Sequence, residues 1–158
     1  MNVPFYERLW MWAAGALIVA FVATVLVTAI GGALQPPSHV ETIDPAQVFK
    51  DPRFAHPGVT ADSTGATVVA VAMMFAFNPS VIRVPAGKPV TFRMTSADVT
   101  HGFLVVGTNA NTMLVPGYVS QFTTVFRQPG EYLIVCHEYC GLGHHFMSAK
   151  LIVEEARP

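Results

Sequence analysis

The sequence has few charged residues and only two cysteines. Charged residues make up 12% and hydrophobic residues 52% of its 158 positions, which is too apolar for an ordinary soluble domain of this size. It contains no internal repeat, phosphate-binding loop, basic nucleic-acid-binding patch or Ser-His-Asp arrangement. These absences argue against a repeat protein, a P-loop nucleotide enzyme, a nucleic-acid-binding protein and a serine hydrolase.

The apolar excess lies at the N-terminus. Residues 9–30 carry no charge, and a helix of that length is ~33 Å long, enough to cross the core of a bilayer. A cleaved signal peptide is the alternative, but the run is too long for a signal-peptide core. Gly31-Gly32-Ala33 does not make a clear small-residue cleavage pattern either. We therefore expect residues 1–33 to form an uncleaved transmembrane anchor.

Flanking residues predict the orientation of this anchor. Arg8 is the sole basic residue on the N-terminal side, and the next one along the chain is Lys50. The positive-inside rule therefore places the N-terminus in the cytoplasm. Trp10 and Trp12 then lie at the headgroup level of that side, where indole rings are enriched, or pack against a partner helix. We expect a single-pass protein of the cytoplasmic membrane, in contact with lipid, whose C-terminal domain lies on the outer, periplasmic side.

The next segment, residues 34–66, is expected to be a linker. It carries five prolines among polar residues and shows little periodicity. Asp44-Pro45 is a plausible helix start, because Asp caps helices and Pro suits the first helical position. His39 and His56 lie in this segment and belong to no recognisable site.

Short strands with turn residues between them are predicted from residue 67 to residue 158. Apolar and polar residues alternate at 90–94 and 122–126, the period-two pattern of a half-buried strand. Further strands are expected at 68–77, 102–106, 132–136 and 149–153, with Gly and Pro at the corners. Roughly seven strands in such a length are typical of an antiparallel β-sandwich. We therefore expect an all-β domain.

Soft metal donors gather in one short run near the C-terminus. Cys136 and Cys140 are followed by His144 and Met147, and thiolate, imidazole and thioether donors together select copper. Glycines between them allow the backbone to fold tightly around an ion. The run therefore predicts a copper site.

Two other uses of the same residues stay open from the sequence. Cys136 and Cys140 are the only cysteines, and a disulfide between them suits a domain outside the cytosol. Zinc is the second rival, because both cysteines, His144 and one more histidine make a closed tetrahedral site. Zinc has no use for Met147, which favours copper.

The run Cys-x-Glu-x-Cys-Gly-x-Gly-His-x-x-Met at 136–147 resembles the binuclear copper (CuA) signature of subunit II of the haem-copper cytochrome c oxidases. The segment Asp98-Val99-Thr100-His101-Gly102-Phe103 resembles the family's upstream histidine segment. The resemblance implies a cupredoxin-like Greek-key sandwich over residues 67–158 that holds two copper ions. It also implies a ligand set in which two cysteines bridge the coppers, two histidines bind one copper each, and a thioether and a main-chain carbonyl complete the site: Cys136, Cys140, His101, His144, Met147 and the carbonyl of Glu138.

Neighbouring residues receive separate interpretations. The spacing from Cys140 matches the family at His144 and not at His145, and His137 is expected to face solvent. Asp98 is either a partner that orients His101 or a solvated turn residue. Phe75 and Phe77 either contribute to an apolar docking face beside the copper or belong to the core.

The implied function is that of a membrane-anchored electron-entry subunit. It accepts electrons from cytochrome c or a small copper protein and passes them to haem in subunit I, where oxygen is reduced and protons are translocated. A further small subunit fits the same picture. The alternatives are the CuA subunit of a nitric oxide reductase-like complex and a free-standing, membrane-tethered copper-binding cupredoxin.

The single span and Tyr6-Glu7-Arg8-x-Trp10 resemble the b-family (ba3-type) oxidases. In that family a subunit II glutamate at the position of Glu7 lies at the cytoplasmic mouth of a proton channel. Otherwise Glu7 is a first-turn carboxylate that suits the helix macrodipole and marks the membrane boundary.

Overall fold

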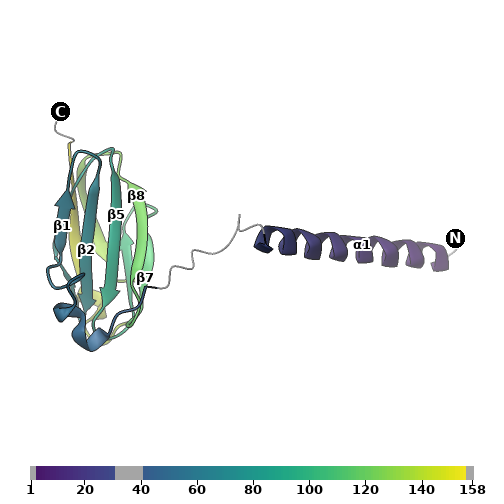
Figure 1. Ribbon diagram of the computed structural model, residues 1–158, viewed down its shortest axis with the longest axis horizontal. Helices are drawn as coiled ribbons and strands as arrows, with labels where there is room; N and C mark the ends of the chain where they lie inside the picture. The colour runs from purple at the N-terminus through teal and green to yellow at the C-terminus, as the bar shows by residue number, and fades with distance from the viewer. Residues whose placement is uncertain (1–2, 31–40, 156–158) are drawn as a thin grey trace. The chain divides into compact units, whose positions relative to one another are not determined.

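The computed structural model describes residues 3–30 and 41–155 of the chain. Contacts divide the chain after His39 into an N-terminal unit and a C-terminal unit (Figure 1). The N-terminal unit contains helix α1, and the C-terminal unit contains every strand of the described residues. Residues 31–40, which include His39 and the end of the expected anchor, lie outside the described residues.

Helix α1 spans Val3–Ile30 and is long and apolar enough to cross a membrane. Apolar side chains are exposed all around it, as in a helix that is solvated by lipid rather than packed on one face. The helix begins earlier than residue 9, so Glu7 lies in its second turn and its first turn has no acidic residue. The helix macrodipole therefore explains the presence of a carboxylate at position 7 less well than the sequence suggested.

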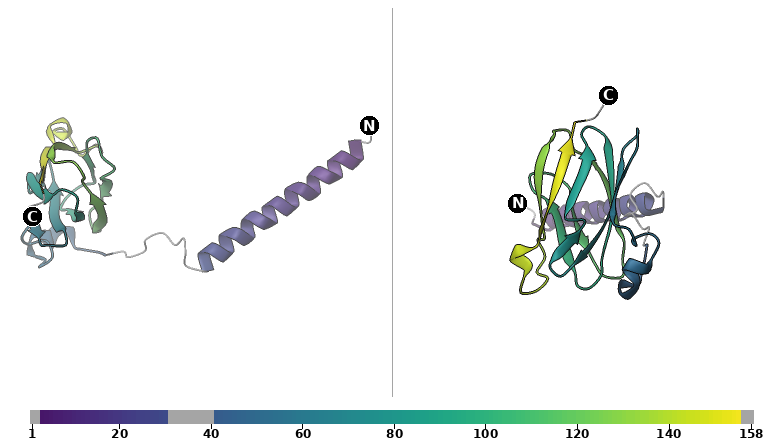
Figure 2. Two further views of the ribbon diagram at one scale, coloured as in Figure 1. Left: turned by 90° about the horizontal axis from the view of Figure 1, so that it is seen from above. Right: turned by 90° about the vertical axis from the view of Figure 1, so that its left-hand side faces the viewer.

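The C-terminal unit is a sandwich of two five-stranded sheets (Figures 1 and 2). The first sheet has the order β1 (Gly58–Ala61), β2 (Ala66–Met73), β5 (Pro89–Ser96) and β8 (Ser120–Val125), with β3 (Ala76–Asn78) also paired to β2. The second has the order β4 (Val81–Pro85), β10 (Ser148–Glu154), β9 (Gly130–Val135), β6 (His101–Val105) and β7 (Asn111–Leu114). Strand pairs β2–β5 and β4–β10 are parallel, and the other pairs are antiparallel. The predicted all-β sandwich is confirmed.

Each predicted strand appears, but the described residues contain ten strands. Strands β1, β4 and β7, which are four or five residues long, were not predicted. The expected strand at 68–77 is interrupted after Met73, and β3 begins at Ala76. This interruption turns Met74 and Phe75 outward, where both are exposed.

The core between the sheets is built from alternate strand residues and is rich in phenylalanine. Phe92 on β5 stacks on Phe122 with ring centroids 5.1 Å apart, and it also lies 5.6 Å from Phe103 of the opposite sheet. Phe77 meets Phe103 edge to face at 5.7 Å. These contacts join the two sheets, because aromatic pairs at such separations are attractive beyond the area they bury.

Residues 41–56, which we call the strap, pack against the first sheet. The strap contains the 3-10 helix η1 (Pro45–Lys50), whose Asp44 cap accepts a hydrogen bond from the Ala46 N–H at 3.0 Å. Val48 and Phe54 are buried against Val71 of β2. The described part of the expected linker over residues 34–66 carries η1, β1 and a small core. The division into 1–33, 34–66 and 67–158 stays a prediction.

Ion pairs fasten the strap to strand β5. The Glu41 carboxylate accepts from Arg93 of β5 at 2.7 Å and from Arg53 at 2.6 Å, and Arg53 also pairs with Asp51 at 2.6 Å. Partial burial opposes ionisation of Glu41, but the two guanidinium groups outweigh it and lower the pKa of this carboxyl. Because single surface pairs contribute little, we assign most of the strap's stability to its buried apolar residues.

The strap offers a matched pair of phenylalanines to test this assignment. Phe54 is fully buried, whereas Phe49 is 46% exposed. We expect Phe54→Ala to lower the free energy of unfolding by about 3–5 kcal/mol, because a large buried ring is lost. Phe49→Ala should change it by about 0.5 kcal/mol or less. Urea unfolding of the full chain in detergent, followed by circular dichroism, measures both, and equal effects would mean that the strap does not pack as described.

Candidate metal centre

The predicted metal donors come from two segments that meet at one end of the sandwich. His101 begins β6, directly after the turn that follows β5. The remaining donors lie on the ligand loop, residues 136–147, which joins the end of β9 to the start of β10. Figure 2 (right) shows this yellow-green loop and the blue strap at the same end. Paired strands therefore fix both attachment points of the donors.

Three buried donors form the centre of the site. The sulfur of Cys136 lies 3.9 Å from the sulfur of Cys140 and 3.9 Å from Nδ1 of His101. Donor atoms of all three residues lie within 4.8 Å of one another. The two sulfurs are not bonded, because a disulfide requires about 2.05 Å and both cysteines are free. The structure thus presents two thiols and an imidazole to a common point.

The other three predicted donors surround the two sulfurs. The Cys140 sulfur lies 3.6 Å from Nδ1 of His144 and 3.6 Å from the sulfur of Met147. The Cys136 sulfur lies 3.2 Å from the main-chain oxygen of Glu138. The structure therefore brings together all six donors named from the sequence. That each of them binds a metal stays a prediction.

Burial determines the chemistry of the thiols. Cys136, Cys140 and Met147 are buried, and His101 is completely inaccessible. Burial, together with the neighbouring Cys136, raises the pKa of Cys140 to about 11. Without a metal this thiol keeps its proton at neutral pH, so an incoming cation has to displace that proton.

Asp98 orients His101. Its Oδ1 accepts a hydrogen bond from Nε2 of His101 at 2.9 Å, which leaves Nδ1 of the ring directed at the sulfur of Cys136. The other carboxylate oxygen accepts from the Met74 N–H at 2.7 Å. Partial burial opposes ionisation, but these bonds and one from the Val99 N–H hold the pKa of Asp98 below its ordinary value. Of the two sequence interpretations, the structure matches the orienting partner.

The structure also separates the remaining histidines. His144 approaches the Cys140 sulfur, whereas His145 is exposed and its ring lies against Phe146 with centroids 3.8 Å apart. His137 is exposed, as predicted, and so is His56.

Phe75 and Phe77 have different roles. Phe77 is 3% exposed and packs on Phe103, so its place in a docking face is excluded. Phe75 is 37% exposed and lies under the ligand loop. A Cβ added to Gly143 would lie 2.5 Å from its ring, and one added to Gly141 would lie 3.0 Å from it. Gly141 also has φ +131°, which favours glycine. The sequence could not separate the two phenylalanines, because the break after Met73 reverses the expected alternation.

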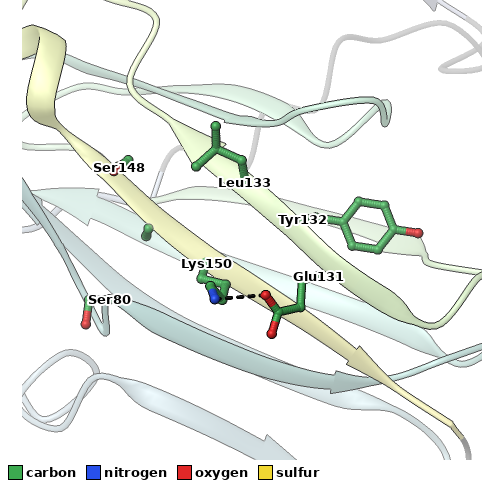
Figure 3. Close-up of a pocket in the computed structure, with 7 residues that line it drawn as sticks. Ser80, Glu131, Tyr132, Leu133, Ser148 and Lys150 are labelled. Carbon is green, nitrogen blue, oxygen red and sulfur yellow. Dashed lines mark hydrogen bonds and ion pairs between the residues drawn. The ribbon is translucent and has the colours of Figure 1, made fainter.

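A shallow groove of about 400 Å³ lies on the outer face of the second sheet (Figure 3). Leu133 and Tyr132 are among the residues that line it, and Lys150 pairs with Glu131 there at 2.8 Å. It contains neither thiol nor imidazole, so it offers no soft donors to a metal.

The donor set fits copper better than zinc. A structural zinc site uses four donors and closes as a tetrahedron, whereas six donor atoms converge here and one of them is the thioether of Met147. Thiolate and thioether sulfurs together favour copper.

Comparison with known proteins agrees with this chemistry. Residues 64–156 match the family model described as cytochrome c oxidase subunit II, periplasmic domain. One cytochrome c oxidase subunit 2 of Thermus thermophilus is 38% identical over 156 residues, covering 95% of this chain and 92% of that protein. Another Thermus thermophilus subunit 2 sequence is 40% identical over 136 residues, covering 84% of this chain and all of that protein.

Solved structures give the same result. A chain of a haem-copper terminal oxidase dimer aligns with a TM-score of 0.61 and 31% identity, covering 94% of this chain and 99% of that chain. The periplasmic domain of subunit II of the Bradyrhizobium japonicum cytochrome oxidase, 20% identical with a TM-score of 0.52, covers 61% of this chain and shares its fold. The predicted cupredoxin-like sandwich is confirmed, and the chain belongs to the cytochrome c oxidase subunit II family.

Proposed function

We propose that this chain is the electron-entry subunit of a haem-copper cytochrome c oxidase. It accepts electrons from cytochrome c or a similar donor outside the cytoplasmic membrane and passes them to haem in subunit I, for oxygen reduction coupled to proton translocation. The observation that carries this proposal is the convergence of six soft or carbonyl donors from two strand-anchored segments. The family membership supports the partner and the reaction.

In this proposal the ligands of two copper ions are His101, Cys136, Cys140, His144, Met147 and the main-chain carbonyl of Glu138. Bound copper supplies a one-electron redox couple. The chain's own part is to hold the donors still, because a site that keeps its geometry in both charge states loses little energy to rearrangement. Asp98 supports this by fixing the His101 ring, and the thiols release their protons when copper binds.

Metal analysis of the copper-loaded full chain tests the centre. We expect two coppers per chain, a purple colour and an unpaired electron that is shared by both copper nuclei. Because protons must leave the thiols, the apparent affinity should rise with pH. A colourless protein that binds one zinc would overturn the proposal.

Single substitutions test the separate ligand roles. Cys140→Ser removes one of the two thiolates that would hold the coppers and should abolish the shared-electron spectrum. Met147→Leu should retain both coppers and shift the reduction potential, because a thioether would be a weak ligand that tunes a copper site more than it holds it. His145→Ala, on the same loop but outside the donor set, is the control and should change neither spectrum nor potential.

The ligand loop also presents the surface on which we propose that the electron donor docks. Leu142, Phe146 and Tyr139 are 90%, 76% and 71% exposed, more than any other large apolar side chain described in residues 41–155. With Phe75 they make the docking face. Some charges elsewhere on the sandwich are paired, as in Arg83–Glu154 and Lys150–Glu131, and the 9 Lys and Arg residues of the chain nearly balance its 10 Asp and Glu residues. Apolar contact rather than a strong field should therefore govern the encounter.

Leu142→Ser tests the docking face. We expect it to slow electron transfer from the donor and to leave the copper spectrum intact, because its side chain projects into solvent. Val125→Ser, an exposed position where β8 pairs with the start of β5, is the control at the opposite end of the sandwich. The wild-type rate should change by less than about threefold between low and physiological salt. A steep fall with salt would show that charges steer the donor instead.

For Glu7 we propose proton collection at the cytoplasmic end of α1. The side chain is exposed on the helix, two residues before the uncharged run begins. A carboxylate at a membrane interface can take protons from water and hand them to a buried polar chain. Subunit I would supply that chain.

Glu7→Gln separates the proton role from a boundary role. We expect the assembled oxidase to keep its copper spectrum and electron entry but to reduce oxygen more slowly. Glu155→Gln removes an exposed carboxylate at the far end of the chain and should have no effect. Unchanged turnover of Glu7→Gln with a donor that is not limiting would leave Glu7 as a boundary residue.

A further inference from the structure

The imidazole of His137 occupies the space that a side chain at position 102 would need. A Cβ built on Gly102 would lie 2.7 Å from three atoms of that ring, Cγ, Nδ1 and Cε1. The three nearest atoms all belong to His137. The ring therefore lies flat against the backbone of residue 102, and Gly102 is buried while His137 remains exposed on its other side.

This contact joins the two segments that carry the metal donors. Gly102 follows His101 on β6, and His137 follows Cys136 on the ligand loop. The backbone pairing of β6 with β9 consists of Leu104 with Val135 and Val105 with Ile134, and it stops before it reaches His101 or Cys136. The His137 ring thus packs beyond the last residue pair of β6 and β9. It joins the residue that follows Cys136 to the residue that follows His101.

We propose that His137 is a positioning residue, which locks the strand of His101 against the loop of Cys136 by filling the place of a side chain on Gly102. The lock is a packing contact, so it requires a flat ring at 137 and no Cβ at 102. It rests on the proposed function only in the identity of the metal, because the packing exists without any ion.

The backbone at residue 102 makes the inference testable. Gly102 is not among the glycines with positive φ, so alanine can adopt its conformation, and the three atoms nearest to the added Cβ all belong to the His137 ring. The effect of a substitution at position 102 therefore measures the contact with the His137 ring. Removal of the ring should restore the space for a methyl group.

A double-mutant cycle in the metal-free full chain tests the lock. With His137 present, we expect Gly102→Ala to raise the unfolding equilibrium constant by about tenfold or more, because the methyl group overpacks the contact. In the His137→Ala background the same change should raise it by less than about threefold. Equal effects in both backgrounds would overturn the proposal. Should Gly102→Ala fail to fold, recovery of folding in the double variant demonstrates the same coupling.

Copper retention tests whether the lock positions the donors. We expect His137→Ala to speed copper loss to a chelator by about tenfold and to alter the nitrogen hyperfine coupling of His101, because the two segments are no longer held together. His137→Phe should restore both towards wild type, since it returns a flat ring without a metal-binding nitrogen. His145→Ala is the matched control on the same loop.

The outcomes separate this inference from the proposed function. Failure of His137→Phe to restore copper retention would mean that the imidazole acts through its nitrogen atoms, and the packing proposal would fall. A coupled cycle in a chain that binds no copper would overturn the proposed function and leave the packing contact established. If the stability effects of Gly102→Ala and His137→Ala are additive and copper loading is normal, the packing proposal is overturned and the proposed function stands.

Discussion

The structure depends on bringing one imidazole to two thiols that lie far from it in sequence. His101 and Cys136 are separated by 35 positions, yet the nitrogen and sulfur lie 3.9 Å apart. No loop can hold that distance by itself, because ordering a flexible segment costs roughly 1–2 kcal/mol per residue. The second sheet removes most of that cost, since β6 and β9 are already paired and deliver both residues to the same end. The donors are thus fixed by strands that are ordered for another reason.

The apolar core lies in the middle of the sandwich, whereas the buried polar groups lie at its metal end. The phenylalanine cluster around Phe92 joins the two sheets in the middle, and there the backbone is regular. Irregular backbone and buried polar groups gather at the metal end, where each needs a partner. Thr95, for example, is buried and donates to the Tyr118 carbonyl at 2.8 Å. Asp98 likewise gives the buried His101 ring a hydrogen-bond partner. A buried polar group without a partner is costly, so these bonds let polar donors exist beside an apolar core.

The sequence predicted the features that depend on residues close together in the chain. The spacing of Cys136, Cys140, His144 and Met147 identified the donors because they share one loop, and alternation found β5 and β8 because each is half buried. Asp44-Pro45 correctly marked the start of η1, but the packing of the strap was not predicted, because Val48 and Phe54 stand among prolines without a regular period. The contact of His137 with Gly102 could not be foreseen either, since it joins residues far apart in sequence and neither type indicates it. A glycine beside a ligand was the one hint, and it acquired meaning only from the ring that covers it.

The strap connects this end of the sandwich to the chain that precedes it. Ala97 packs against the strap's apolar cluster together with Val71 of β2, and the next residue is Asp98, which accepts the hydrogen bond from His101. The Ala97 N–H also donates to the Ala72 carbonyl of β2 at 3.0 Å. The turn that supports the buried histidine is therefore held on one side by the sheet and on the other by the segment that follows the membrane helix in sequence. Because packed interiors transmit strain rather than absorb it, loosening the strap would displace Ala97 first and the orienting carboxylate next. The strap is thus a structural support of the metal centre as well as a connection to the anchor.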